Sequence, residues 1–206
     1  METKSLTKGK LLKFQSEVYY LYKEGKMITR YTYPKEYFYI SNKLGEAKIY
    51  FPDKNEVYVK TDKLFTTENN VLYIFLNNKT QDMGLMDLKF KVKETRFDEG
   101  LSVTTWIPPV ELLSRISKVE LVHENYQPIY SAYYKDEKIV QKIYYYDYMI
   151  LNQFSLPQNI TQIDYFANGD STINKITISD LKSGLKANSQ YFDFIIPEDA
   201  KIINNE

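Results

Sequence analysis

Few residues of this 206-residue chain could carry out catalysis. His123 is the only histidine, so a Ser-His-Asp arrangement or a histidine-based metal site would rest on that residue alone. It stands next to Glu124 on a stretch of alternating polar and apolar residues. At such a position an exposed imidazole is a more common role for histidine than a catalytic base. We therefore expect His123 to be a surface residue.

The remaining catalytic motifs are absent or have a simpler explanation. Gly169-Asp170-Ser171 resembles the nucleophile block of one esterase family, but no histidine follows Ser171 as that block requires. Asn168-Gly169-Asp170 has the composition of a hairpin turn. The sequence holds no G-x-S-x-G, H-E-x-x-H, Walker or G-x-G-x-x-G motif. It also lacks cysteine, which excludes thiol catalysis, disulfides and Cys-based metal sites. We therefore expect no enzyme, no metal and no cofactor.

Composition indicates a folded, strand-rich chain. Tyrosine occurs 20 times and phenylalanine 11 times, and both favour the half-buried surface of a sheet. Lys+Arg and Asp+Glu are balanced at 27 each, so composition gives no basic surface for a nucleic acid. The length fits a single domain over residues 1–206.

Apolar and polar residues alternate along most of the chain, as in strands with one exposed face. From three such stretches we expect these side chains to point inward: Phe90, Val92, Val119, Leu121, Ile176 and Ile178. Lys89, Lys91 and Lys93 should point outward. Further strands are predicted over Phe14–Tyr22, Lys26–Tyr33, Ala47–Phe51, Glu56–Lys60, Leu101–Ile107, Ile129–Tyr134, Ile139–Tyr148, Ile160–Ala167 and Phe192–Ile196.

Short turn sequences separate these strands and predict antiparallel neighbours, because a parallel pair needs a long crossover. One segment differs: from Thr67 to Leu88 the apolar residues Val71, Leu72, Ile74, Phe75 and Leu76 fall at helical spacing. Thr67 is the expected N-cap. Gly84 interrupts the segment, which favours two short helices over one long helix.

The tyrosine runs Tyr37-Phe38-Tyr39 and Tyr144-Tyr145-Tyr146 could stack on bases or sugars. Consecutive residues of a strand point to opposite faces, so neither run forms one platform. Packing within the sheet is the favoured explanation.

Several blocks, taken in order, resemble the outer-membrane lipoprotein carrier (LolA-like) family. They cover nearly the whole chain and include Gly25-Lys26-Met27 with Tyr31-Thr32-Tyr33-Pro34, the run from Ile49 to Val57, Ile107-Pro108-Pro109, the strand Ile116–Leu121, Ile176–Asp180 and Phe192–Pro197. The family commonly has an arginine in an R-W-x-Y-x-x-P block. That position is Ile28 here, and Arg30 lies two residues later, on the same face of an alternating strand.

The resemblance implies a mainly β fold, an incomplete, strongly curved antiparallel barrel with short helices forming a lid. It implies a periplasmic carrier that holds the acyl chains of lipoproteins or lipids between the inner and outer membranes. Its partners would be acylated lipoproteins, an inner-membrane lipoprotein-releasing transporter and an outer-membrane receptor, and the carrier would be a monomer. The expected cavity and lid residues are Met27, Arg30, Tyr31, Ile49, Phe51, Val71, Leu72, Phe75 and Leu76.

The alternatives are a carbohydrate-binding or adhesive β-sandwich that uses exposed tyrosines, and a hydrolase that a serine-directed probe would reveal. No stretch approaches the ~20 apolar residues of a membrane helix. The first residues, METKSLTKGKLLKF, lack an apolar signal core. Either the protein is cytosolic or a signal peptide was removed ahead of Met1, and the resemblance favours the second.

Overall fold

The structure is a computed structural model that describes residues 1–61, 71–152 and 154–203. It is mainly β, and fourteen strands of the described residues follow one another in a single sheet. The strand order is linear, with β14 and β7 at its two ends, so the sheet is not closed into a ring. The predicted class, an incomplete antiparallel barrel, is confirmed.

Contacts divide the chain into two compact units. Unit 1 holds residues 1–2, 13–73 and 180–206, and unit 2 holds residues 3–12 and 74–179. The prediction of one domain over residues 1–206 stays a prediction.

Unit 1 contains most of β2 (Lys10–Leu21), then β3 (Lys26–Tyr33), β4 (Tyr37–Ser41), β5 (Glu46–Phe51), β6 (Glu56–Thr61) and β14 (Lys201–Ile203). Successive strands from β2 to β6 pair antiparallel, as the short turns between them predict. β14 pairs parallel to β6. The sequence pattern did not predict β4 or β14.

The C-terminal segment covers one face of the unit 1 sheet. Ile28, Phe38, Tyr50 and Val57 are buried on this face, and Tyr191, Phe194, Ile196 and Ala200 pack against them. The predicted strand Phe192–Ile196 is therefore wrong: Gln190–Asp193 is a 3-10 helix, and residues 194–196 belong to no strand. Alternation arises here because Phe194 and Ile196 pack down onto a sheet face, without pairing along an edge.

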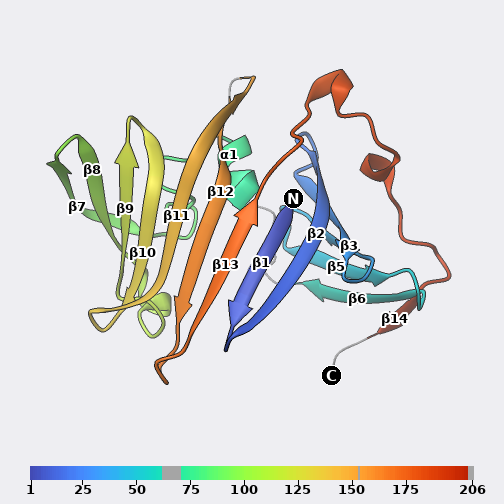
Figure 1. Ribbon diagram of the computed structural model, residues 1–206, viewed down its shortest axis with the longest axis horizontal. Coiled ribbons are helices and arrows are strands. Elements are labelled where there is room, and N and C mark those ends of the chain that lie inside the picture. Colours follow the sequence, from blue (N-terminus) through green and yellow to red (C-terminus); the bar gives the residue numbers. More distant parts are fainter. Residues whose placement is uncertain (62–70, 153, 204–206) are drawn as a thin grey trace. The chain divides into compact units, whose positions relative to one another are not determined.

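Unit 2 contains β1 (Glu2–Thr7), β7 (Lys91–Asp98), β8 (Leu101–Ile107), β9 (Lys118–Glu124), β10 (Gln127–Lys135), β11 (Lys138–Leu151), β12 (Phe154–Tyr165) and β13 (Ser171–Thr177). β7 to β13 pair in chain order, and β1 follows β13 in the sheet (Figure 1). A two-residue turn matches the right-handed twist of the two strands that it joins when both of its central residues have positive φ. Glu99 (φ 47°) and Gly100 (φ 85°) meet that requirement between β7 and β8.

The alternation argument holds for most of the predicted inward residues of unit 2. Phe90, Val119, Leu121 and Ile178 are at most 5% exposed, and Ile176 is half-buried. Lys89, Lys91 and Lys93 are exposed, as predicted. Val92 is a wrong prediction, since its side chain is 53% exposed. It lies on the end strand β7, whose eight residues are all exposed on both faces.

Among the described residues, α1 (Val71–Leu76) is the α-helix of the chain, within the predicted helical segment. The expected N-cap Thr67 lies outside the described residues. A second short helix after Gly84 was predicted wrongly, because residues 77–89 form turns. The Asp82 carboxylate accepts hydrogen bonds from the backbone N–H groups of Gly84 and Met86. Such local bonds compete with a helix.

Three short 3-10 helices complete the described elements: Val110–Leu112, Gly184–Lys186 and Gln190–Asp193.

Candidate functional site

Four of the nine predicted ligand residues share one face of the unit 1 sheet. Directly opposed residues of antiparallel strands point to the same side. Tyr31 opposes Tyr37, and Tyr39 opposes Ile49. This surface, called the Met27 face, carries Met27, Tyr31, Ile49 and Phe51. Met27 is only 1% exposed.

Aromatic rings form a continuous row on the Met27 face. The rings of Tyr31 and Tyr37 stack with centroids 4.2 Å apart, and Phe51 stacks on Tyr37 at 5.7 Å. Tyr58 meets Phe51 edge-on at 5.8 Å. The four rings are half-buried. They give this face a continuous apolar strip.

The first half of α1 contacts the same face within unit 1. The ring of Tyr73 meets the ring of Tyr20 edge-on at 5.8 Å. Tyr20 is the cross-strand partner of Met27. Leu72 is buried and Val71 is half-buried. Tyr73 therefore contacts the Met27 face, and the lid role of this helix stays a prediction.

Arg30 lies on the opposite face of the unit 1 sheet, with the buried Ile28. Its guanidinium bonds Glu36 at 2.7 Å and Glu17 at 3.1 Å, and it stands over the Tyr191 ring at 4.5 Å. It does not share a face with Met27, Tyr31, Ile49 and Phe51. The expectation that Arg30 belongs to the cavity or lid stays a prediction.

The strand register of unit 2 determines which side chains share one face of its sheet, and we call the face that carries Val119 and Leu121 the inner face. Val119 and Leu121 of β9 oppose Tyr133 and Ser131 of β10. The same face continues across the sheet to Tyr145, which opposes Ile160. Leu121, Ser131, Tyr145 and Ile160 are all buried.

Phe75 of α1 packs onto this inner face. Its side chain is 2% exposed, and its ring lies 5.8 Å from that of Tyr145 and 6.1 Å from that of Tyr148. Each tyrosine hydroxyl has a partner: Tyr145 shares a hydrogen bond with Ser131, and Tyr148 donates to the Pro128 carbonyl. Leu76 is half-buried. Two aromatic partners thus hold Phe75 in place.

The turns after α1 extend this contact. We call residues 74–90 the cover segment; its side chains Ile74, Phe75, Met83, Leu85 and Phe90 are buried. His123 on the inner face is 9% exposed, and its Nε2 lies 2.8 Å from the Thr80 carbonyl oxygen. The expectation of a surface imidazole is therefore wrong. His123 helps to attach the cover segment to the sheet.

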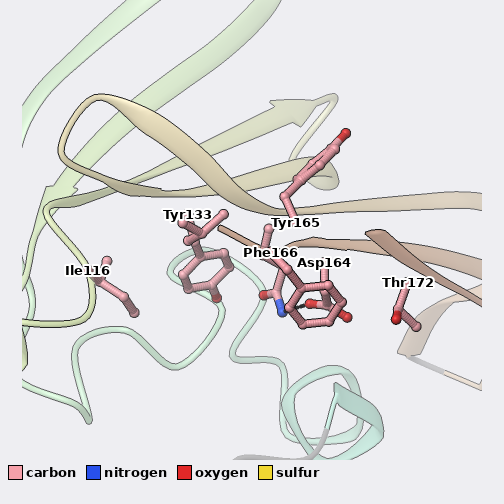
Figure 2. Close-up of a pocket in the computed structure, with 8 residues that line it drawn as sticks. Ile116, Tyr133, Asp164, Tyr165, Phe166 and Thr172 are labelled. Carbon is pink, nitrogen blue, oxygen red and sulfur yellow. Dashed lines mark hydrogen bonds between the residues drawn. The ribbon is translucent and has the colours of Figure 1, made fainter. Parts of the chain in front are cut away.

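A pocket of about 570 Å³ opens in unit 2 (Figure 2). It is lined by Ile116, Tyr133, Val140, Gln141, Asp164, Tyr165, Phe166 and Thr172. Tyr133, Gln141, Asp164 and Thr172 continue the inner face, because their strands place them in register with one another. The pocket is thus the part of the inner face that the cover segment leaves open.

None of the nine predicted ligand residues lines this pocket. None lines a second pocket of about 420 Å³ in unit 1, which is bordered by Lys26, Lys43, Lys48 and Ile195 among others. Sequence reasoning therefore missed the pocket residues. The alternation in β11 and β12 places Gln141 and Asp164 on the inner face, but polar residues of an amphipathic strand are ordinarily assigned outward.

Burial alters the acidity of several tyrosines in both units. It is the main cause that raises the pKa of Tyr37 to about 12, and the nearby Tyr31 adds to the effect. Burial, followed by the charges of Tyr144 and Glu120, raises the pKa of Tyr130 to about 12. Burial also raises the pKa of Tyr145 strongly. The fold favours the neutral phenol at these positions.

This predicts a distinct alkaline titration. A free tyrosine ionises near pH 10. A raised folded pKa contributes stability that is present below pH 10 and is lost as the pH rises toward 12. Absorbance at 295 nm should show a late class of phenols that ionises together with unfolding. Tyr37→Phe should remove one phenol from that class, and a single transition near pH 10 would contradict the packing described here.

The similarity of this chain to known proteins is found in its structure. No family model matches the sequence, and no curated protein matches it. A solved LolA superfamily protein from Nitrosomonas europaea aligns with a TM-score of 0.55 at 10% identity, covering 88% of this chain and 84% of that one.

Two further solved structures align similarly. A domain assigned to an outer membrane lipoprotein-sorting protein from Vibrio parahaemolyticus has a TM-score of 0.57 at 15% identity, with 92% of this chain and 85% of that one covered. A DUF1329 family protein from Desulfovibrio piger has a TM-score of 0.54 at 12% identity, with coverages of 88% and 85%. At these identities the likeness concerns the fold, and the predicted LolA-like resemblance is confirmed at that level.

Within residues 1–61, 71–152 and 154–203, no helix combines the length and the apolar composition needed to span a membrane. The same residues contain no group of three or more histidine, aspartate and glutamate side chains placed to hold a metal ion.

Proposed function

We propose that this protein is a periplasmic carrier that binds the acyl chains of lipoproteins or lipids and transfers them from the inner to the outer membrane. The observation that carries the proposal is the packing of Phe75 on the inner face of unit 2. A short helix closes part of an apolar sheet face there, beside an open pocket. The fold shared with a LolA superfamily protein and a lipoprotein-sorting domain supports it.

The physical basis is burial of alkyl chains. Each methylene moved from water to an apolar site contributes about 0.8 kcal/mol. The inner face offers the buried apolar side chains of Val119, Leu121 and Ile160. An acyl chain would take the place of Phe75 against Tyr145 and Tyr148. The cover segment is the element that would move.

The proposed partners follow from this cargo. Acylated lipoproteins would arrive from an inner-membrane lipoprotein-releasing transporter and leave to an outer-membrane receptor. The carrier would act as a monomer, since one chain supplies both the sheet face and its cover. It would perform no covalent chemistry.

Binding of a fluorescent fatty-acyl probe tests the proposal. The expected result is a saturable rise in emission as the probe leaves water, reversed by unlabelled palmitate because both compete for one apolar site. Titration by fluorescence gives the stoichiometry, which should be one probe per chain. A probe that shows no saturable binding up to its solubility limit would contradict the carrier function.

A carbohydrate-binding or adhesive role is the second candidate. The outer face of unit 2 carries Tyr130, Tyr144 and Tyr146, and the last two are 38% and 40% exposed. The ring centroids of Tyr130 and Tyr144 lie 5.0 Å apart. Oligosaccharide binding that is lost in Tyr144→Ala, together with no acyl binding, would favour this role over the carrier.

A further inference from the structure

The Asp164 carboxylate has an unusual set of partners. Its Oδ1 accepts hydrogen bonds from the side-chain amides of Gln141 at 2.7 Å and Gln162 at 2.9 Å. Its Oδ2 accepts from Gln162 at 2.9 Å and Asn174 at 3.5 Å. Three neutral side-chain amides, one from its own strand β12 and one from each of the neighbouring strands β11 and β13, therefore fix this carboxylate in one orientation at the wall of the pocket, where Figure 2 labels Asp164.

Amides orient the carboxylate and leave its charge in place. None of the ion pairs found among the described residues includes Asp164. Lys142 follows Gln141 in β11 and points to the other side of the sheet from Asp164. Its Nζ lies 5.9 Å from the ring of Tyr165, a pocket residue that follows Asp164 in β12 and points to the same side as Lys142. The pocket thus carries a negative charge whose observed partners are neutral. A cationic ligand group would complement it.

Apart from Thr172, the remaining pocket walls are aromatic and aliphatic. Tyr133 and Phe166 contribute rings, and Ile116 and Val140 contribute aliphatic side chains. Phe166 is 51% exposed, so part of its ring surface is accessible. Aromatic faces attract organic cations, quaternary ammonium groups in particular. Methyl-substituted or alkyl-substituted ammonium groups also fit aliphatic walls better than a strongly hydrated metal ion does.

We propose that this pocket binds an alkylammonium group, held by Asp164, Tyr133 and Phe166. The proposal rests on the carrier function and names the head-group chemistry of its cargo: an acyl or alkyl chain that ends in, or lies close to, a positively charged amine. The ammonium group occupies the open end of the inner face. The chain follows the apolar surface toward the cover segment.

Two detergents of equal chain length and opposite charge, dodecyltrimethylammonium and dodecyl sulfate, test the proposal by calorimetry below their micelle concentrations. The cationic probe should bind about tenfold more tightly than the anionic one, the size of one good cation–aromatic and carboxylate contact. Tetramethylammonium, which lacks the chain, should bind far more weakly. If it binds as tightly as the dodecyl probe, the ligand is a free amine and the ammonium site itself is upheld.

Asp164→Asn should remove the preference for the cationic probe while fatty-acyl binding persists. Asp147→Asn is the matched control: it removes the same charge from an exposed position of β11 outside the pocket, and the preference should remain. If Asp164→Asn does not fold, the affinities of the unchanged protein for the two detergents still show whether the pocket prefers a cationic head group.

Equal affinities for both detergents, with acyl binding intact, would overturn the ammonium site and leave the carrier function standing. Absence of binding by both detergents and by the fatty-acyl probe would overturn both.

Discussion

Phe75→Ala is expected to lower the free energy of unfolding by about 3–4 kcal/mol and to speed the uptake of a fatty-acyl probe. Phe75 is 2% exposed, so its loss leaves a cavity between α1 and the sheet. It also removes both ring contacts, to Tyr145 and Tyr148. Chemical denaturation measures the first effect, and stopped-flow fluorescence measures the second.

The faster uptake follows from the proposal that the packing of Phe75 on the inner face represents a closed state of the carrier. If the acyl chain needs the inner face that Phe75 occupies, only molecules with the cover segment displaced can bind. Apparent affinity then falls in proportion to the fraction of open molecules. Weakening the contacts of Phe75 raises that fraction, so the variant should bind both faster and more tightly.

Phe97→Ala is the matched control for this experiment. It removes the same ring from β7 of unit 2, where the side chain is 82% exposed. Its effect on stability should stay within about 0.5 kcal/mol, as for most surface substitutions, and uptake should not change. A Phe75→Ala protein that loses stability without any gain in uptake would identify α1 as an ordinary part of the core.

Most strands of this fold, though not β1, β4 or β14, could be predicted locally, because each needs only its own alternation and a turn at either end. Val92 shows the limit of that argument. It alternates with lysines as a buried residue would, yet β7 ends the sheet and no described element covers its side chain. Position within a sheet is a long-range property. Phe194 shows a different limit. It lies within a segment predicted as a strand, but it belongs to no strand of the structure and packs on a face of the unit 1 sheet.

The site was less accessible to prediction, because it depends on strand register. Met27 and Arg30 lie three residues apart on β3, and that odd spacing sends them to opposite faces. The partner of Phe75, Tyr145, lies far along the chain, and nothing in the sequence joins them. Inward amides such as Gln162 and Asn174 resemble ordinary exposed residues until the register of β12 and β13 places them around Asp164.

The second large effect concerns the C-terminal segment of unit 1. Phe194 stacks on Phe38 with ring centroids 4.0 Å apart and planes 7° from parallel, and it lies 6.1 Å from Tyr50. Phe38 is 3% exposed and Ile28 is fully buried beside it. Phe194→Ala would open this cluster to water. A buried phenylalanine replaced by alanine costs 3–5 kcal/mol, and the half-buried Phe194 should cost about 3 kcal/mol.

Ile195→Ala provides the comparison, because this neighbouring side chain is 80% exposed and should contribute no more than about 0.5 kcal/mol. Urea denaturation of both variants measures the difference. The resemblance to lipoprotein carriers includes the block from Phe192 to Pro197, which the structure uses to cover a sheet face. A Phe194→Ala protein as stable as Ile195→Ala would mean that this block does not hold the C-terminal segment on unit 1. A loss near 3 kcal/mol, with acyl binding by unit 2 retained, would assign the block a structural role.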